Sequence, residues 1–173
     1  MASISAEAVR QASEQVTRLG RTADFRVGDL TAIGLDAGSA NAVLCVDAIQ
    51  FAEEPEAAYR ELLRVLVPGG RAVLTCWESL NRQDERVPDR LRRVDLAEGL
   101  AVAGFDDIDV RDRPDWRAAE RAMWEEAAAL DPGDDPALQS FHDEGVRALE
   151  MFTLIRRVIA TATAPGVAPS MNR

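Results

Sequence analysis

The sequence predicts an α/β fold in which helices cover a mostly parallel, Rossmann-like sheet. The apolar run 42–46 lies between turn-forming residues, which is typical of a strand buried on both faces of a parallel sheet. A helical pattern follows at 53–66, with Glu53, Glu54 and Pro55 favourable at its start. A second apolar run, 72–77, comes directly after the Pro-Gly-Gly segment 68–70, which is expected to stop the helix. This order of strand, helix and strand, with short connections, predicts βαβ units.

The residues before this unit predict one helix and one strand. Ser5 is in position to cap a helix whose apolar residues recur at helical spacing, and Gly20 stands where that helix would end. The apolar positions are Val9, Ala12, Val16 and Leu19. Phe25 and Val27 alternate with polar residues, which predicts a short strand ending at Gly28 and Asp29.

The C-terminal half predicts a loop, three helices and two strands. The polar segment 78–89 is expected to be a loop, and 91–103 a helix that Gly104 ends. A strand at 105–110 precedes two helices, 115–130 and 135–153, which the turn DPGDDP separates. A final strand is predicted at 158–162. We therefore expect one domain over residues 1–163, with the helical pair 115–153 inserted as a cover, and a flexible tail at 164–173.

Composition and charge describe a globular domain and exclude several kinds of partner. The chain has 173 residues, of which 47% are hydrophobic and 29% charged, and its net charge is −10. Nucleic-acid partners are excluded because phosphate binding needs a clustered cationic surface. The single His and the two Cys, which lie inside apolar runs, exclude a zinc cluster and a disulfide framework. No stretch resembles a signal peptide or a membrane span, so we expect a soluble cytoplasmic protein with no membrane partner.

Several motifs carry a family resemblance. They read FRVGDL at 25–30, AVLCVDAIQF at 42–51 and RELLRVLVPGGR at 60–71, and AGF at 103–105 and RRVIATA at 156–162 fit the same order. With these motifs the chain resembles the class I S-adenosylmethionine-dependent methyltransferases, in the small-molecule branch with a UbiE-like (type 11) core. The resemblance implies methyl transfer from S-adenosylmethionine to a small-molecule acceptor.

The sequence contains no G-x-G, whereas the family's first strand leads into a glycine-rich loop that cradles the cofactor. By the resemblance this loop would precede Met1, and Ser3 occupies the place of the acid that binds the ribose. The fold is therefore expected to lack its first strand or strands. Because close approach of the backbone to a ligand needs glycine, we expect weak or absent binding of S-adenosylmethionine by this chain.

The first pair of candidate site residues is Asp29 and Leu30. The resemblance implies that the Asp29 carboxylate accepts a hydrogen bond from the adenine amino group, with the backbone of Leu30 alongside. Its place after a predicted strand favours this role, because ligands of open α/β sheets bind at the carboxyl ends of strands. The alternative is a turn-forming Asp, which is common after Gly at a strand end.

The second pair is Asp47 and Gln50, which follow the apolar run 42–46. The resemblance places them beneath the methionine portion of the cofactor, facing the substrate, while the alternative for Asp47 is a cap on the next turn. The family often has a His after the Gln, and Phe51 stands there in this chain, so no base is expected at that position. Trp77 is expected either to line a substrate pocket or to belong to the core.

Two functions from different classes are consistent with these residues. The first is a methyltransferase acting on a small molecule, with the helical pair as its substrate cover. The second is a non-catalytic methyltransferase-like remnant that acts as a binding or interaction module. A missing central strand would leave an apolar sheet edge, which favours self-association. A start codon assigned too late would also account for the missing loop.

Overall fold

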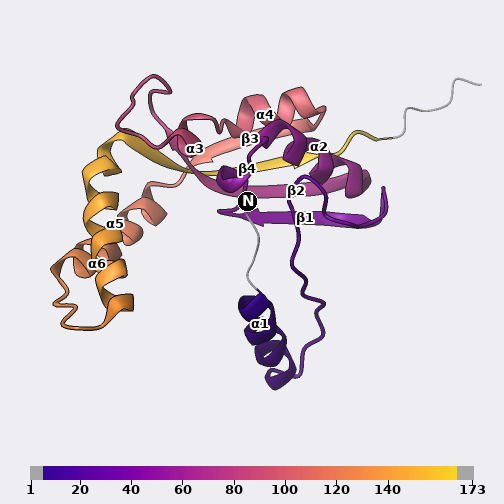
Figure 1. Cartoon of the computed structure of the whole chain (residues 1–173). Helices are drawn as coiled ribbons and strands as arrows, with labels where there is room; N and C mark the ends of the chain where they lie inside the picture. The colour runs from indigo at the N-terminus through magenta and orange to yellow at the C-terminus, as the bar shows by residue number, and fades with distance from the viewer. Residues whose placement is uncertain (1–5, 167–173) are drawn as a thin grey trace, which may run out of the picture.

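The computed structural model describes residues 6–166, and one four-stranded sheet organises that range (Figure 1). The strands are β1 (Ala40–Val46), β2 (Leu66–Ser79), β3 (Asp106–Asp112) and β4 (Ile155–Thr163), in the spatial order β1-β2-β4-β3. β1 and β2 are parallel, whereas β4 is antiparallel to both of its neighbours. The predicted α/β fold is confirmed, and β4 makes the sheet mixed.

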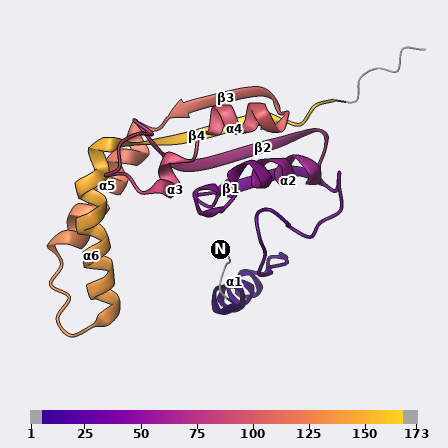
Figure 2. The ribbon, with the colours of Figure 1, turned by 45° about the horizontal axis from the view of Figure 1, so that its top comes forward.

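The main hydrophobic core lies between this sheet and two helices, α2 (Pro55–Val65) and α4 (Leu96–Ala103), which lie together against one face (Figure 2). Tyr59 and Leu62 of α2 pack there with Leu96 and Leu100 of α4. The strand residues that face them alternate along each strand, as the side-chain period of two requires. They are Cys45, Ala72, Leu74, Cys76, Val158, Ala160 and Ala162.

The sequence suggested that the Pro-Gly-Gly segment 68–70 lies between α2 and β2, but the structure shows otherwise. β2 begins directly after α2, so the segment belongs to the strand, at an irregularity in its register with β1. A Cβ atom at Gly70 would lie 2.8 Å from the Val67 carbonyl oxygen and 3.2 Å from that of Asn41. Only glycine fits this close approach of two strands, so the role of the segment is architectural.

The predicted single helix at 91–103 is two helices, α3 (Asp89–Arg92) and α4. The Asp95 carboxylate accepts a hydrogen bond of 2.8 Å from the Glu98 backbone N–H, which caps α4 and separates it from α3. Gly104, with φ 97°, ends α4 as predicted. The predicted loop at 78–89 starts later than expected, because Glu78 and Ser79 still pair with β4.

The prediction that β1 is buried on both faces is wrong. Cys45 points toward the core, but Leu44 and Val46 on the opposite face are 70% and 56% exposed. The predicted strand at Phe25 and Val27 is also wrong, since residues 21–28 form no strand. A strand needs a neighbour for its backbone hydrogen bonds, and within the described residues β1 is the edge of the sheet with no strand on that side.

α1 (Ala6–Arg18) stands apart from the sheet in both views (Figures 1 and 2). It ends as predicted at Gly20, where the Arg21 N–H donates to the Val16 carbonyl and the Gly20 N–H to the Thr17 carbonyl, both at 3.0 Å. None of its residues is buried, so its apolar face remains uncovered by the described part of the chain. Ser3 and Ser5, to which the sequence assigned roles, lie outside the described residues.

Two further helices form a pair at one end of the sheet (Figure 1). They are α5 (Pro114–Ala129) and α6 (Pro136–Met151), which confirms the two helices predicted there. Asp135 caps α6 by accepting hydrogen bonds from the backbone N–H groups of Ala137 and Leu138. Two short 3-10 turns, η1 (Ile49–Phe51) and η2 (Phe152–Leu154), follow β1 and α6. Ala164, in the predicted tail, is buried and bonded to Gly69 and Gly70, while residues 167–173 lie outside the described range.

Candidate functional site

Two large hollows lie beside β1 and the residues that follow it. We call the first the edge groove: it has about 610 Å³, follows β1, and its lining includes Asp29, Leu30, Ile33, Val43, Leu44 and Val46. We call the second the aromatic pocket: it has about 590 Å³, lies beside α5 and α6, and its lining includes Phe51, Trp77, Trp124 and Phe152 with Asp47 and Glu120. The turn η1, which follows β1, contributes Gln50 and Phe51 to the aromatic pocket.

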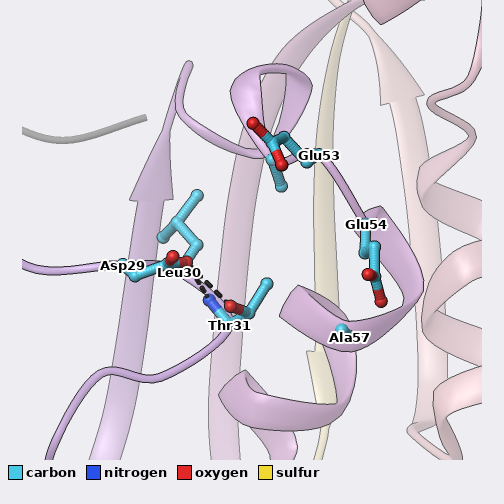
Figure 3. Close-up of a pocket in the computed structure, with 7 residues that line it drawn as sticks. Asp29, Leu30, Thr31, Glu53, Glu54 and Ala57 are labelled. Atoms are coloured by element: carbon cyan, nitrogen blue, oxygen red, sulfur yellow. Dashed lines mark hydrogen bonds between the residues drawn. The ribbon is translucent and has the colours of Figure 1, made fainter. Parts of the chain in front are cut away.

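Asp29 and Leu30 lie together in the edge groove. The Asp29 Oδ1 atom accepts hydrogen bonds of 2.8 Å from both the backbone N–H and the hydroxyl of Thr31 (Figure 3). These two bonds, the backbone one first, hold the pKa of Asp29 below its ordinary value. Asp29 is therefore an ionised, turn-forming residue, and because both bonds use Oδ1, its second oxygen remains available to a ligand.

A smaller hollow of about 200 Å³ adjoins the groove at the start of α2. Figure 3 shows the loop of Asp29, Leu30 and Thr31 on one side of it and Glu53, Glu54 and Ala57 on the other. Three carboxylates around one small space favour a ligand that donates hydrogen bonds over an anion.

Asp47 and Gln50 both line the aromatic pocket. Asp47 has a positive φ of 53° directly after β1, and its carboxylate accepts a hydrogen bond of 3.0 Å from the Thr75 hydroxyl. Gln50 is buried in η1, and its side-chain oxygen accepts a hydrogen bond of 3.2 Å from the Trp77 backbone N–H. Gln50 thus fixes η1 to β2, which is a structural role that the sequence did not reveal.

The strongest electrostatic feature of the aromatic pocket is Arg157 of β4, a residue that sequence analysis missed. Its side chain is only 6% exposed and makes a two-pronged ion pair with Asp47, in which Nη1 and Nη2 contact Oδ1 and Oδ2. Its Nε atom lies 2.9 Å from Glu120 Oε1 of α5. That contact is a close approach of charges and not an aligned hydrogen bond, since the buried Nε has no hydrogen-bond partner.

The two carboxylates around Arg157 are therefore not equivalent. Asp47 is held by two guanidinium nitrogens and one hydroxyl, whereas Glu120 has only the poorly aligned contact with Nε from this arginine. Burial, aided by the charge of Asp47, raises the pKa of Glu120 above its ordinary value, although the charge of Arg157 opposes the shift. A hydrogen bond with the Trp77 side chain also opposes the shift. Glu120 is therefore held less completely than Asp47 and is the carboxylate of this cluster better able to meet a ligand.

Aromatic rings surround this cluster. The Arg157 guanidinium lies 5.5 Å from the centre of the Trp77 ring and 5.9 Å from that of Trp116. Trp77 also packs edge-to-face on Phe152, with ring centres 5.4 Å apart. Both interpretations open for Trp77 hold, because it lines the pocket and also packs against the small core cluster of Val87, Leu91 and Ile155.

A second ion pair anchors the sheet next to the pocket. Glu78, buried at the end of β2, accepts a hydrogen bond of 2.7 Å from the Leu96 N–H and pairs with Arg156 at 2.7 Å. The sequence placed Glu78 in a loop and therefore gave no sign of this. The Leu96 N–H is one of the free donors at the start of α4, so Glu78 ties β2, β4 and α4 together.

The structure thus divides the four predicted site residues between two hollows, with Asp29 and Leu30 in one and Asp47 and Gln50 in the other. The only sequence signal for Arg157 was a pair of arginines directly before a predicted strand. The only signal for Glu120 was a carboxylate among apolar positions of a predicted helix. His142 lies beside Asp143 on α6 and lines neither hollow. Residues 6–166 contain no group of side chains that could hold a metal ion and no helix long and apolar enough to cross a membrane.

Sequence comparison links the N-terminal part of the chain to one family. Residues 2–74 match the family described as a methyltransferase domain. No curated protein sequence matches the chain.

Solved structures share the fold over most of the chain. The [4+2]-cyclase SpnF matches with a TM-score of 0.71 and 24% identity, covering 94% of this chain and 64% of its own. Phosphoethanolamine N-methyltransferase 2 from Haemonchus contortus, in complex with S-adenosyl-L-methionine, matches with a TM-score of 0.67 and 20% identity, covering 89% of this chain and 40% of its own. A protein from Galdieria sulphuraria assigned as a sarcosine dimethylglycine methyltransferase matches with a TM-score of 0.76 and 14% identity, covering 94% of this chain and 68% of its own.

These likenesses show the fold. The chain spans 64% and 40% of the lengths of the first two proteins. The presence of a cyclase beside methyltransferases means that the fold alone does not fix the reaction, which depends on the residues of the site.

Proposed function

We propose that this chain, which has the fold of the class I S-adenosylmethionine-dependent methyltransferases and matches the methyltransferase domain family over residues 2–74, binds S-adenosylmethionine in the edge groove and a small methyl acceptor in the aromatic pocket. The observation that carries the proposal is the pairing of the two hollows. Both are lined by residues at or just beyond the carboxyl end of β1, and the aromatic pocket also by Trp77 near the end of β2. Open α/β sheets bind their ligands at such strand ends. When bound, the cofactor supplies an electrophilic methyl group on a sulfonium ion.

The edge groove fits one half of this cofactor. Leu30, Ile33 and Val46 provide apolar walls for a flat adenine ring, and the free Asp29 oxygen suits its amino group. The described residues that line the groove include no glycine-rich turn that could cradle the amino-acid half, and the one cationic side chain among them, Arg26, is paired with Asp24 at 2.8 Å. We therefore propose that the chain binds the cofactor weakly, with a dissociation constant of roughly millimolar size.

A titration with S-adenosylhomocysteine, followed by NMR, tests this assignment. We expect shifts of the backbone signals of Leu30 and Val46 at millimolar ligand, and weaker binding in Asp29→Asn. An asparagine oxygen can still accept the two Thr31 hydrogen bonds, so this change removes the charge and keeps the turn. Asp36→Asn, an exposed position outside the groove lining, is the matched control. Shifts confined to other surfaces, or equal binding by Asp29→Asn, would refute the assignment.

The exposed edge of β1 supports a second function, that of an interaction module. Its free backbone groups and the exposed Leu44 and Val46 side chains form a surface that can add another strand. On this proposal the chain associates with a second copy through β1. The two functions compete for the same groove, because Leu44 and Val46 also line it.

A further inference from the structure

We infer that the aromatic pocket recognises an amine in its ammonium form, with Glu120 as the residue that pairs with the cation. This inference rests on the proposed function, since it names the chemical class of the methyl acceptor. The pocket binds the ammonium form, and the nitrogen must lose one proton to solvent to expose the lone pair that attacks the methyl group. It follows from how the charges of the pocket are divided and from what surrounds them.

The cluster around Arg157 has more negative than positive charge. Arg157 carries one positive charge, which the two-pronged pair with Asp47 balances. Glu120 adds a second negative charge, which shares the same Arg157 through a contact of 2.9 Å with Nε that is poorly aligned as a hydrogen bond. A partly buried carboxylate in this position is stabilised by a further cation that donates hydrogen bonds to it.

The walls of the aromatic pocket also suit a cation. Trp77, Trp124 and Phe152 line the same pocket as Glu120, and aromatic faces attract cations through their quadrupole. Trp77 and Phe152 already have arginine guanidinium groups near their rings, at 5.5 Å from Arg157 and 4.9 Å from Arg117. Aromatic walls beside the Glu120 carboxylate suit a compact ammonium group on an apolar body.

Other charged groups also face the pocket. From α3 and α6 these are Arg90, Glu144 and Arg147. All three are exposed, so water and salt screen their charges more than they screen the charge of Glu120. Arg90 also lies 4.9 Å from the centre of the Phe51 ring. An anion would therefore bind at the rim, next to Arg90 or Arg147, and not at Glu120.

Calorimetric titration of the full chain with three small probes tests the inference. The probes are 2-phenylethylamine, its neutral analogue 2-phenylethanol, and the anion 3-phenylpropionate. At near-neutral pH we expect the amine to bind at least about tenfold more tightly than the alcohol or the anion. The preference should fall as the pH is lowered through the pKa of Glu120, because the protonated carboxyl no longer attracts the cation. Equal binding of amine and alcohol, or tighter binding of the anion, would overturn the inference.

The variant Glu120→Gln keeps the shape of the side chain and removes its charge. We expect it to lose the preference for the amine while binding the alcohol as the parent chain does. Glu126→Gln, an exposed change on the same helix with the same effect on net charge, should keep the preference. If Glu120→Gln does not fold, as judged by circular dichroism, the three-probe comparison on the parent chain still decides the matter.

The outcome is separable from that of the proposed function. Loss of S-adenosylhomocysteine binding at the edge groove, with the amine preference intact, would contradict the cofactor assignment alone. Binding of S-adenosylhomocysteine without any amine preference would leave the methyltransferase proposal standing and remove the substrate class.

Discussion

At the scale of the residue, the arrangement around Arg157 decides what the aromatic pocket can do. A buried arginine needs partners for its donors, and it finds them on two segments distant in sequence, Asp47 after β1 and Glu120 on α5. The candidates Asp47 and Gln50 were found from the sequence because they follow an apolar strand. Their partners Arg157 and Thr75 were not, because only the pairing of β1, β2 and β4 brings them near.

The raised pKa of Glu120 makes a prediction about stability and pH. A carboxyl whose pKa is higher in the folded chain binds its proton more tightly there than in the unfolded chain. The folded state therefore loses stability as the pH rises from below the ordinary carboxyl pKa to above the raised one. The glutamine of Glu120→Gln cannot titrate. The free energy of unfolding of this variant should therefore rise relative to that of the parent chain as the pH increases from about 4 to about 7.

Urea unfolding of both chains at the two pH values measures this difference. Glu126→Gln controls for the change in net charge. The expectation is contradicted if Glu120→Gln loses stability relative to the parent as the pH rises. That result would mean that the attraction of Arg157 lowers the pKa of Glu120 more than burial raises it.

At the scale of the element, close contacts set how the helices sit on the sheet. α2 and α4 meet where Gly99 faces Tyr59, which is almost fully buried. A Cβ atom at Gly99 would lie 2.1 Å from Tyr59 Cε2. The glycine therefore serves the packing of two helices, a role that its sequence position in a predicted helix did not reveal.

Gly99→Ala is expected to destabilise the chain in spite of a better helix propensity. Alanine gains about 1 kcal/mol over glycine in an exposed helix, but overpacking a core contact costs about 1–3 kcal/mol. We expect a lower midpoint of urea unfolding for Gly99→Ala and little change for Val102→Ala, an exposed position on the same helix. An unchanged or higher midpoint for Gly99→Ala would mean that Tyr59 moves aside freely.

At the scale of the whole molecule, the sheet has one well-covered face and one open edge. α2 and α4 cover the core side, while β1 presents Leu44 and Val46 to solvent and α1 stands away from it. Exposed apolar edge strands pair readily with other chains.

We therefore expect the chain to sediment as a dimer or larger species at micromolar concentration. The double change Leu44→Lys and Val46→Lys should shift it toward the monomer, because charges on an edge strand oppose pairing. Val102→Lys, equally exposed on α4, is the control. A monomeric parent chain in sedimentation velocity would exclude the interaction module.

By itself the sequence determined the α/β class, the positions of the main helices and strands, and two candidate residues, Asp47 and Gln50, just after a strand. These depend on local periodicity, capping residues and glycines, which act within a few positions along the chain. The structure alone decided that β1 is an exposed edge, that Phe25 and Val27 form no strand, and that Asp29 and Asp47 line different hollows. It alone brought Glu120 and Arg157 together. Burial, strand pairing and ion pairs depend on residues far apart in sequence, so no local pattern records them.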